Sequence, residues 1–230
     1  MAEKEKDYYN ILPEDFSKYD LSYKIIVIGD EGVGKTCLSR KATKNDFENF
    51  YTPTIGFEFL SFNVKIKDKN IHLQIWDTSG QEVYRSLVNG FYRNSALAIL
   101  IYSIDNENSF NNLESWINEI KEKSHPNVKI FLIGNKNDLE NNRKINLDEG
   151  KKFSEEHGLN MFFEASAKTG FNAQKIFIEA ANTLYEETLK YRERANRNNS
   201  NLDQNGFSPD IPGLLVLDEE NYKKKKKCCS

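Results

Sequence analysis

Cysteine is scarce in this chain, which has only three cysteines among 230 residues. Cys37 stands alone, and Cys228 and Cys229 are adjacent near the end, so the pattern does not suit a disulfide framework. Long apolar runs are also absent, because the longest, residues 96–102, falls far short of the roughly 18 residues that a membrane-spanning helix needs. Residues 1–6 are charged with no apolar stretch behind them, so no secretory signal is visible and we expect a cytosolic protein.

The net charge is small, but its distribution is uneven. The chain has 32 Lys and Arg against 35 Asp and Glu, for a formal net charge of −3. Residues 223–227 are five consecutive lysines, and without them 27 basic residues face 35 acidic ones, a net charge of −8. An acidic body joined to a basic end argues against nucleic acid as the main partner, and for an anionic surface that only the tail meets.

Strand and helix patterns alternate along the middle of the chain. The predicted strands are residues 23–28, 57–66, 71–76, 97–102, 129–133 and 161–163, and helical spacing follows at residues 36–38, 110–120, 146–153 and 173–184. The second and third strands alternate in polarity around a polar turn, which predicts a hairpin. The fourth and fifth are continuously apolar, as expected of central strands. Asn146 and Glu149 resemble a capping box. This order predicts an α/β domain with a mostly parallel sheet.

Three regions follow from these patterns. Residues 1–20 are predicted to be a polar N-terminal extension, residues 21–195 the folded domain, and residues 196–230 a flexible tail rich in Asn, Ser and Gly. Residues 211–217 interrupt the tail with an apolar segment that is too short to form a core. This segment is either a strap on the domain surface or a docking segment for a partner.

Residues 29–36 read Gly-Asp-Glu-Gly-Val-Gly-Lys-Thr and fit the phosphate-binding pattern G-x-x-x-x-G-K-[ST], between a predicted strand and a predicted helix. In such a P-loop, backbone N–H groups face the phosphates, and Gly32 and Gly34 let the chain wrap closely around anionic oxygens. Lys35 would add charge at the outer phosphates, and Thr36 would ligate Mg²⁺. An ordinary glycine-rich turn is the alternative, but the Lys-Thr pair in this context favours a nucleoside triphosphate.

A base-recognition motif is predicted at residues 135–138, Asn-Lys-Asn-Asp, directly after an apolar strand. Asp138 can accept two N–H bonds from a guanine ring, a pair of donors that adenine does not offer. Lys136 can lay its methylene stem over the base. Taken alone, these four residues could be a polar loop, but together with a P-loop they indicate guanine.

Two further segments complete the predicted site. Asp77 ends a predicted strand and would help to hold Mg²⁺, through a water molecule. Gly80 would turn its amide toward the γ-phosphate, and Gln81 would orient a water for in-line attack. Residues 164–168, Glu-Ala-Ser-Ala-Lys, follow the last strand and would offer a backbone N–H to the guanine carbonyl oxygen.

In their order and spacing, these four motifs resemble the Ras superfamily of small GTPases over about residues 21–195. Within it, the chain is most similar to the Rab family in residues 55–59, 73–77, 84–87, 99–102 and 115–120. The resemblance implies a P-loop NTPase G domain, with a six-stranded, mostly parallel sheet flanked by about five helices. It also implies a switch I from about Phe47 to Gly56 and a switch II from Gly80 to about Tyr92, both ordered by GTP and Mg²⁺.

The resemblance also assigns the site residues. Nucleotide contacts are implied at Glu31, Gly32, Val33, Gly34, Lys35, Thr36, Cys37, Phe47, Tyr51, Thr54, Gly80, Asn135, Lys136, Asp138, Ser166, Ala167 and Lys168. The implied metal ligands are Thr36, Thr54 and Asp77, and the catalytic residue is Gln81. Phe47 would pack edge-on against guanine, and Thr54 would reach both Mg²⁺ and the γ-phosphate. Cys37 is also expected to be a small packed side chain under the P-loop helix.

Four positions depart from the family pattern. Ser79 replaces the usual Ala, which should be nearly neutral, and Val83 replaces a basic residue, which would change partner preference on switch II. Glu31 stands where relatives mostly have a small residue close to the γ-phosphate. A larger side chain there crowds the attacking water, so we expect slow intrinsic hydrolysis. At the terminus, a lone Ser230 follows the cysteine pair.

The end of the chain resembles the paired-cysteine termini of Rab proteins, which receive two geranylgeranyl groups. Lys227 is the fourth residue from the end, so this is not a C-a-a-X box. One lipid attaches a protein only reversibly, so Cys228 and Cys229 together with the lysine run would give a stable anchor. By the same resemblance, residues 211–217 would engage the prenylation escort machinery.

The predicted function is a Rab-like GTP-binding switch that hydrolyses GTP to GDP in vesicle-mediated transport. Implied partners are an exchange factor, a GTPase-activating protein, a GDP dissociation inhibitor or escort protein, and effectors. We expect a monomer, lipid-anchored on the cytoplasmic face of an intracellular membrane and cycling with the cytosol. The alternatives are a GTP-bound interaction module whose turnover Glu31 blocks, which the intact Gln81 disfavours, and an adenine-specific P-loop ATPase or kinase, which Asp138 disfavours. His72, His125 and His157 lack metal-ligand spacing.

Overall fold

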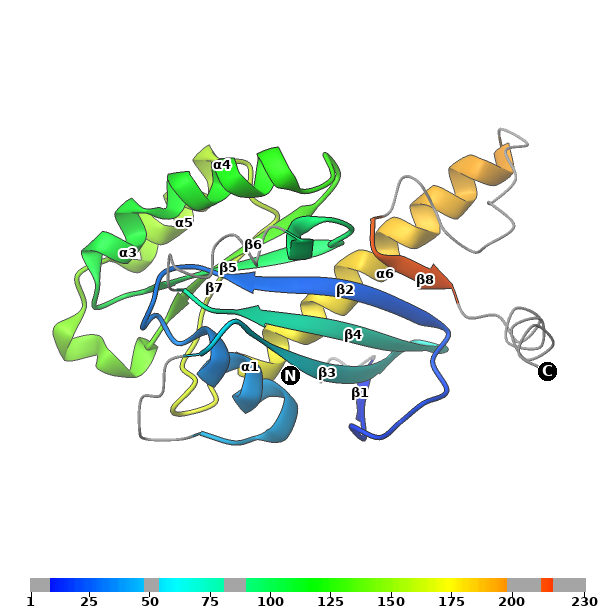
Figure 1. The fold of residues 1–230 in the computed structure, drawn as a ribbon, viewed down its shortest axis with the longest axis horizontal. Coiled ribbons are helices and arrows are strands. Elements are labelled where there is room, and N and C mark those ends of the chain that lie inside the picture. The colour runs from blue at the N-terminus through cyan, green and yellow to red at the C-terminus, as the bar shows by residue number, and fades with distance from the viewer. Residues whose placement is uncertain (1–8, 48–53, 81–89, 198–211, 217–230) are drawn as a thin grey trace, which may run out of the picture.

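A computed structural model describes residues 9–47, 54–80, 90–197 and 212–216, which form one sheet with helices on both of its faces (Figure 1). The strands are β1 (Tyr9–Leu12), β2 (Leu21–Ile28), β3 (Phe57–Ile66), β4 (Lys69–Thr78), β5 (Leu97–Ser103), β6 (Lys129–Asn135), β7 (Met161–Glu164) and β8 (Leu214–Val216). The α-helices are α1 (Lys35–Lys44), α3 (Glu107–Asn111), α4 (Leu113–Lys123), α5 (Leu147–Glu156) and α6 (Ala173–Arg197), and η2 (Asn137–Asn142) is a 3₁₀ helix.

The sheet confirms the predicted fold class. Its strand order is β1-β3-β4-β2-β5-β6-β7, and β2 pairs in parallel with both β4 and β5. The parallel pairing continues from β5 through β6 to β7. The predicted hairpin is β3 and β4, which pair antiparallel from Phe57 opposite Thr78 to Ile66 opposite Lys69. Both central strands, β5 and β6, are buried along nearly their whole length, as their unbroken apolar sequence predicted.

The N-terminal extension contains a strand that the sequence analysis missed. β1 pairs antiparallel with the far half of β3, with Tyr9 opposite Ile66 and Leu12 opposite Asn63. The Asn63 side-chain amide then donates to the carbonyl oxygens of Pro13 (2.9 Å) and Glu14 (3.1 Å). These bonds hold the turn that follows β1 against β3. The expected six strands are therefore the core of a larger sheet.

The tail supplies the other additional strand, β8, which lies beside the first residues of β2. It pairs antiparallel with β2, with Tyr23 opposite Leu214 and Leu21 opposite Val216. This edge of β2 is free because β5 joins β2 only from Ile25 onward. The expectation of a tail without regular structure is wrong at these residues. The described residues 212–216 thus agree with the strap interpretation, whereas docking to a partner stays a prediction.

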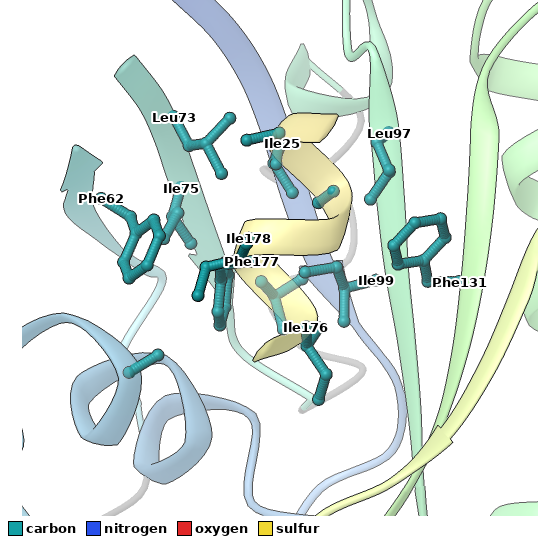
Figure 2. Close-up of a cluster of buried hydrophobic side chains, with 14 of the residues drawn as sticks. Ile25, Phe62, Leu73, Ile75, Leu97, Ile99, Phe131, Ile176, Phe177 and Ile178 are labelled. Atoms are coloured by element: carbon teal, nitrogen blue, oxygen red, sulfur yellow. The ribbon is translucent and has the colours of Figure 1, made fainter. Parts of the chain in front are cut away.

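Two hydrophobic clusters hold the helices to the sheet. One lies under α1 and α6, and the other packs α3, α4 and α5 against the opposite face (Figure 1). Figure 2 shows part of the first cluster, where Phe177 of α6 lies among Ile25, Phe62, Ile99 and Phe131 from four different strands. The strand core is covered on both faces, so its carboxyl ends are the part of the sheet left for a ligand.

The helix ends bear on one sequence prediction, the capping box at Asn146. Asn146 is the N-cap residue of α5, but its side chain makes no capping hydrogen bond, so the predicted capping box is wrong. By contrast, Asn106 caps α3 by accepting from the backbone N–H groups of Asn108 and Ser109. Among the described ranges, no helix combines the length and apolar character that crossing a bilayer requires.

Candidate functional site

The predicted P-loop lies between the end of β2 and the start of α1, as its motif required. Gly34 caps α1 in a left-handed conformation with φ +92°, and a Cβ at this position would lie 2.5 Å from Asn135 Nδ2. Gly29, with φ +139°, is held equally tightly, because a Cβ there would lie 2.2 Å from the carbonyl oxygen of Ile101. The glycines therefore allow both the turn and its close contact with β5 and β6.

Lys35 is the charged side chain of this loop, and it is only 6% exposed. Its Nζ donates to the carbonyl oxygens of Gly29 (2.9 Å) and Asp30 (2.7 Å). Burial lowers the pKa of Lys35 to about 8, and the nearby carboxylates of Asp77 and Asp30 oppose this shift. An ammonium group that is this poorly solvated gains strongly from an anionic ligand.

The three predicted metal ligands, drawn from distant parts of the sequence, lie together beside Lys35. Thr36 Oγ1 is 2.7 Å from Thr54 Oγ1 and also donates to Asp77 Oδ2. Asp77 is fully buried, and its second oxygen, Oδ1, has no hydrogen-bond partner among the described residues. Burial raises the pKa of Asp77 to about 7, whereas the Thr36 hydroxyl and the Lys35 ammonium act in the opposite direction. The cluster thus contains an orphaned carboxylate oxygen beside two hydroxyl groups.

The two predicted guanine segments are joined to each other and to the P-loop. Asn135 Nδ2 donates to the Val33 carbonyl oxygen (2.8 Å), and Asn135 Oδ1 accepts from the backbone N–H of Ala167 (3.3 Å). Asp138 Oδ1 accepts from Ser166 Oγ at 2.5 Å. Asn135 therefore joins the P-loop to the segment of residues 164–168. The hydroxyl of Ser166 orients the carboxylate of Asp138, which is predicted to bind the base.

A sequence model of the Ras family matches residues 24–186 of this chain. The match runs from β2 into α6, and it contains the P-loop, Thr54, Asp77 and both guanine segments. The chain belongs to the Ras family. As a Ras-family protein it is a GTP-binding switch with a GTPase domain, and the resemblance found in the sequence is confirmed at this level.

Ras-family GTPases generally bind GTP or GDP together with Mg²⁺, and the residues of this chain fit that metal. Hydroxyl and carboxylate oxygens are the ligands that Mg²⁺ prefers, and Asp77 Oδ1 is a buried acceptor for which the described part of the chain offers no donor. Thr36, Thr54 and Asp77 would hold the ion, which when bound supplies positive charge to the phosphate oxygens. Because the predicted switch I includes Thr54, this side of the site would join the P-loop to a switch.

The remaining predicted site residues divide into described and undescribed ones. Gly80 lies against the P-loop, because a Cβ on it would be 2.5 Å from both Glu31 N and Lys35 Nζ. Tyr51 and Gln81 lie outside the described residues, as do Cys228 and Cys229. Glu31, Gly32 and Lys168 are exposed, and Val33 is buried.

Three predicted contact residues are placed by packing or by backbone conformation. Cys37 and Phe47 are partly buried against the core cluster under α1 and α6. For Cys37 this confirms the expected packed side chain, while the edge-on contact of Phe47 with guanine stays a prediction. Lys136 adopts a left-handed backbone with φ +64°, and its Nζ lies 3.8 Å from Asp105 Oδ1.

The sequence analysis missed an ion pair that fixes the guanine segments of this Ras-family domain. The guanidinium of Arg143 donates to both carboxylate oxygens of Glu164, at 2.6 and 2.9 Å, and also to Glu140. Glu164 Oε2 accepts in addition from Asn137 Nδ2 at 2.8 Å. The hydrogen bonds to Glu164 and Glu140 raise the pKa of Arg143 above its usual value. No local sequence signal pairs Arg143 with Glu164, because Arg143 lies in a loop and Glu164 ends β7, 21 residues further along the chain.

Proposed function

We propose that this Ras-family GTPase is a Rab-like switch that recruits effectors during vesicle-mediated transport. The observation that carries the proposal is an aromatic surface beside the two switches, formed by Phe57, Phe59, Trp76 and Phe91. Its first three members come from the segments that resemble Rab proteins, residues 55–59 and 73–77. The surface lies where switch I leads into β3 and where β4 leads toward switch II.

The contacts within this surface are close, yet much of it remains open to solvent. The ring of Phe57 lies 5.4 Å from that of Trp76 and 4.6 Å from that of Phe91, and Phe59 meets Trp76 edge-on at 5.5 Å. Phe57 is 47% exposed and Phe59 is 49% exposed. Clustered exposed aromatic rings are typical of protein interaction sites, where aromatic side chains contribute much of the binding energy.

The switch would work through Thr54. With GTP and Mg²⁺ bound, Thr54 would be held in its position beside Thr36 and Asp77, and the chain that leads to Phe57 would be held with it. Loss of the γ-phosphate would remove this restraint, with Gln81 orienting the attacking water. We further propose that Cys228 and Cys229 carry lipids, which would place the protein on the cytoplasmic face of an intracellular membrane.

One experiment tests effector recruitment and its dependence on nucleotide. Protein loaded with a non-hydrolysable GTP analogue or with GDP is used to capture binding proteins, for wild type, Phe59→Ala and the control Phe171→Ala, which removes another exposed phenylalanine. We expect capture only with the GTP analogue, its loss in Phe59→Ala and its retention in the control. Equal capture in both nucleotide states would contradict the proposed switch.

A second experiment tests the anchor. A tagged chain is localised beside a variant that carries Cys228→Ser and Cys229→Ser. We expect the wild type on an intracellular membrane and the variant in the cytosol, because the basic run alone binds anionic lipid weakly at physiological salt. The same distribution for both proteins would refute lipid anchoring at these cysteines without touching the GTPase assignment.

Glu31 favours a second candidate, a GTP-bound interaction module with very slow turnover. Its exposed side chain stands on the P-loop, and its backbone N lies against Gly80. Single-turnover hydrolysis by wild type and Glu31→Ser separates the candidates, because relief of crowding should raise the rate several-fold. Equal rates, with and without an activating protein, would remove this role for Glu31.

A further inference from the structure

Asp30 is a P-loop residue whose side chain turns away from the loop and toward α4. Its Oδ1 accepts from the indole Nε1 of Trp116 at 2.7 Å, and its Oδ2 accepts from the side-chain amide of Asn112 at 2.7 Å. Asn112 is the residue that separates α3 from α4, and Trp116 lies one turn further along α4. Both carboxylate oxygens therefore have a donor at the N-terminal end of α4.

The donors differ in how they are supported. Trp116 is only 8% exposed and belongs to the hydrophobic cluster that includes Ile26 and Ile28 of β2, so its indole N–H is aimed by the core. Asn112 is exposed, and its place is set by the backbone between two helices. The carboxylate of Asp30 is thus bound by one buried donor, Trp116, and one exposed donor, Asn112.

The backbone of Asp30 has a separate task, because its carbonyl oxygen accepts from Lys35 Nζ at 2.7 Å. The residue is therefore fixed from two sides, with the side chain held by α4 and the main chain by the phosphate-binding lysine. A carboxylate beside amides that bind phosphate repels the polyphosphate if it turns toward them. The bonds from Trp116 and Asn112 keep this negative charge on the side of α4.

We propose that Trp116 and Asn112 are positioning residues for nucleotide binding, which act through Asp30 by holding its carboxylate away from the phosphates and its carbonyl against Lys35. The proposal rests on the P-loop binding a guanine nucleotide, and it adds a helix outside the predicted motifs to the machinery. Since Trp116 contacts the loop directly, its fluorescence should also respond when nucleotide is exchanged or released.

The test measures the dissociation rate of a fluorescent GDP analogue, chased with excess unlabelled GDP in the presence of Mg²⁺. The full-length variants are Trp116→Phe, which keeps an aromatic ring in the core, and Asn112→Ala, which alters an exposed side chain. Asn118→Ala, an exposed asparagine on the same helix, is the matched control. A net hydrogen bond to a charged group changes an equilibrium constant roughly tenfold, so we expect each variant to accelerate release about three- to tenfold, and the control to match wild type.

A double-mutant cycle distinguishes positioning from general loss of stability. In an Asp30→Ala background, Trp116→Phe should have no further effect on GDP release, because its target is gone, while its effect on unfolding by urea should persist. Release rates within twofold of wild type in both single variants would overturn the proposal, and so would an undiminished effect of Trp116→Phe in the Asp30→Ala background. If wild type itself fails to bind GDP, the proposed function falls together with this inference, whereas normal binding with unchanged variants refutes only the inference.

Discussion

Truncating Leu214 tests how firmly the strap β8 is attached. Leu214 is 2% exposed and belongs to the core cluster under α6, together with Leu21 and Tyr23 of the neighbouring strand. Burying a leucine side chain contributes about 1.5–3 kcal/mol, and truncation of a core leucine to alanine costs about 2–5 kcal/mol. Leu214 therefore makes a substantial apolar contribution to the attachment of the strap.

The opposing term is the order imposed on the strap. Fixing the backbone of one residue costs about 1–2 kcal/mol, so holding residues 212–216 costs about 5–10 kcal/mol before their contacts are counted. Burial of Leu214 and the hydrogen bonds of the strap to β2 together offset this cost, so losing most of the leucine side chain weakens the attachment. Because β8 pairs with β2 alone among the described strands, we expect Leu214→Ala to release the strap instead of leaving a cavity.

Hydrogen exchange at Lys24 reports this release, because its amide donates to the Gly213 carbonyl oxygen at 3.3 Å. A loss of about 2 kcal/mol corresponds to roughly thirtyfold faster exchange at this amide. The free energy of unfolding, measured with urea, should fall by no more than about 3 kcal/mol. Leu147→Ala, which truncates a leucine that is 52% exposed at the start of α5, should change neither quantity.

Two results would refute this reasoning. Unchanged exchange at Lys24 together with a stability loss above about 3 kcal/mol would mean that the strap stays attached around a cavity. Unchanged exchange and unchanged stability would mean that Leu214 contributes nothing to the core. An independent variant, Gly213→Val, should also release the strap, since a Cβ at Gly213 would lie 2.2 Å from the Asn94 carbonyl oxygen.

Three further predictions concern stability, each measured by urea unfolding. Tyr23→Phe removes the bond of the buried phenol to Thr188 Oγ1 (2.7 Å) and should cost about 1 kcal/mol; a cost near zero would contradict a net contribution from that bond. Arg143→Ala leaves Glu164 buried without its ion-pair partner and should cost about 3 kcal/mol, whereas a neutral result would show that the pair is not desolvated. Burial lowers the pKa of His72, so its stabilising effect is complete above the unfolded-state value of about 6.5 and is lost as pH falls below it. Wild type should therefore lose more stability than His72→Gln between about pH 7.5 and about pH 5.5, and parallel losses would exclude His72 as a cause.

The sequence predicted those parts of the molecule that are specified by neighbouring residues. The P-loop could be found because its glycines, lysine and threonine lie within eight consecutive residues, between a strand and a helix. The hairpin of β3 and β4 followed from alternating polarity on either side of a turn. The joint position of Thr36, Thr54 and Asp77 followed indirectly, since the family motifs fix it even though the residues are distant in sequence.

The missed features depend on partners from distant segments. β1 and β8 are too short to show a period, and each forms because an unpaired strand edge is available beside it. The bonds of Asp30 to Asn112 and Trp116 join the P-loop to a helix for which the sequence predicted only an apolar face. The capping box at Asn146 is the opposite case, because a local sequence pattern was present but the predicted side-chain hydrogen bond did not form.

The position of β8 also limits how far the end of the chain can extend from the domain. From the end of α6 at Arg197 to Cys228 there are 31 residues, which could span about 105 Å if fully extended. With the strap paired to β2 up to Val216, only the 12 residues from 217 to 228 remain, and they can span about 40 Å. The strap β8 pairs with the beginning of β2, at the opposite end of that strand from the phosphate-binding loop. If the end of the chain is held at a surface, this shorter reach would keep the beginning of β2 close to that surface. The phosphate-binding loop, at the other end of β2, would then face away from it.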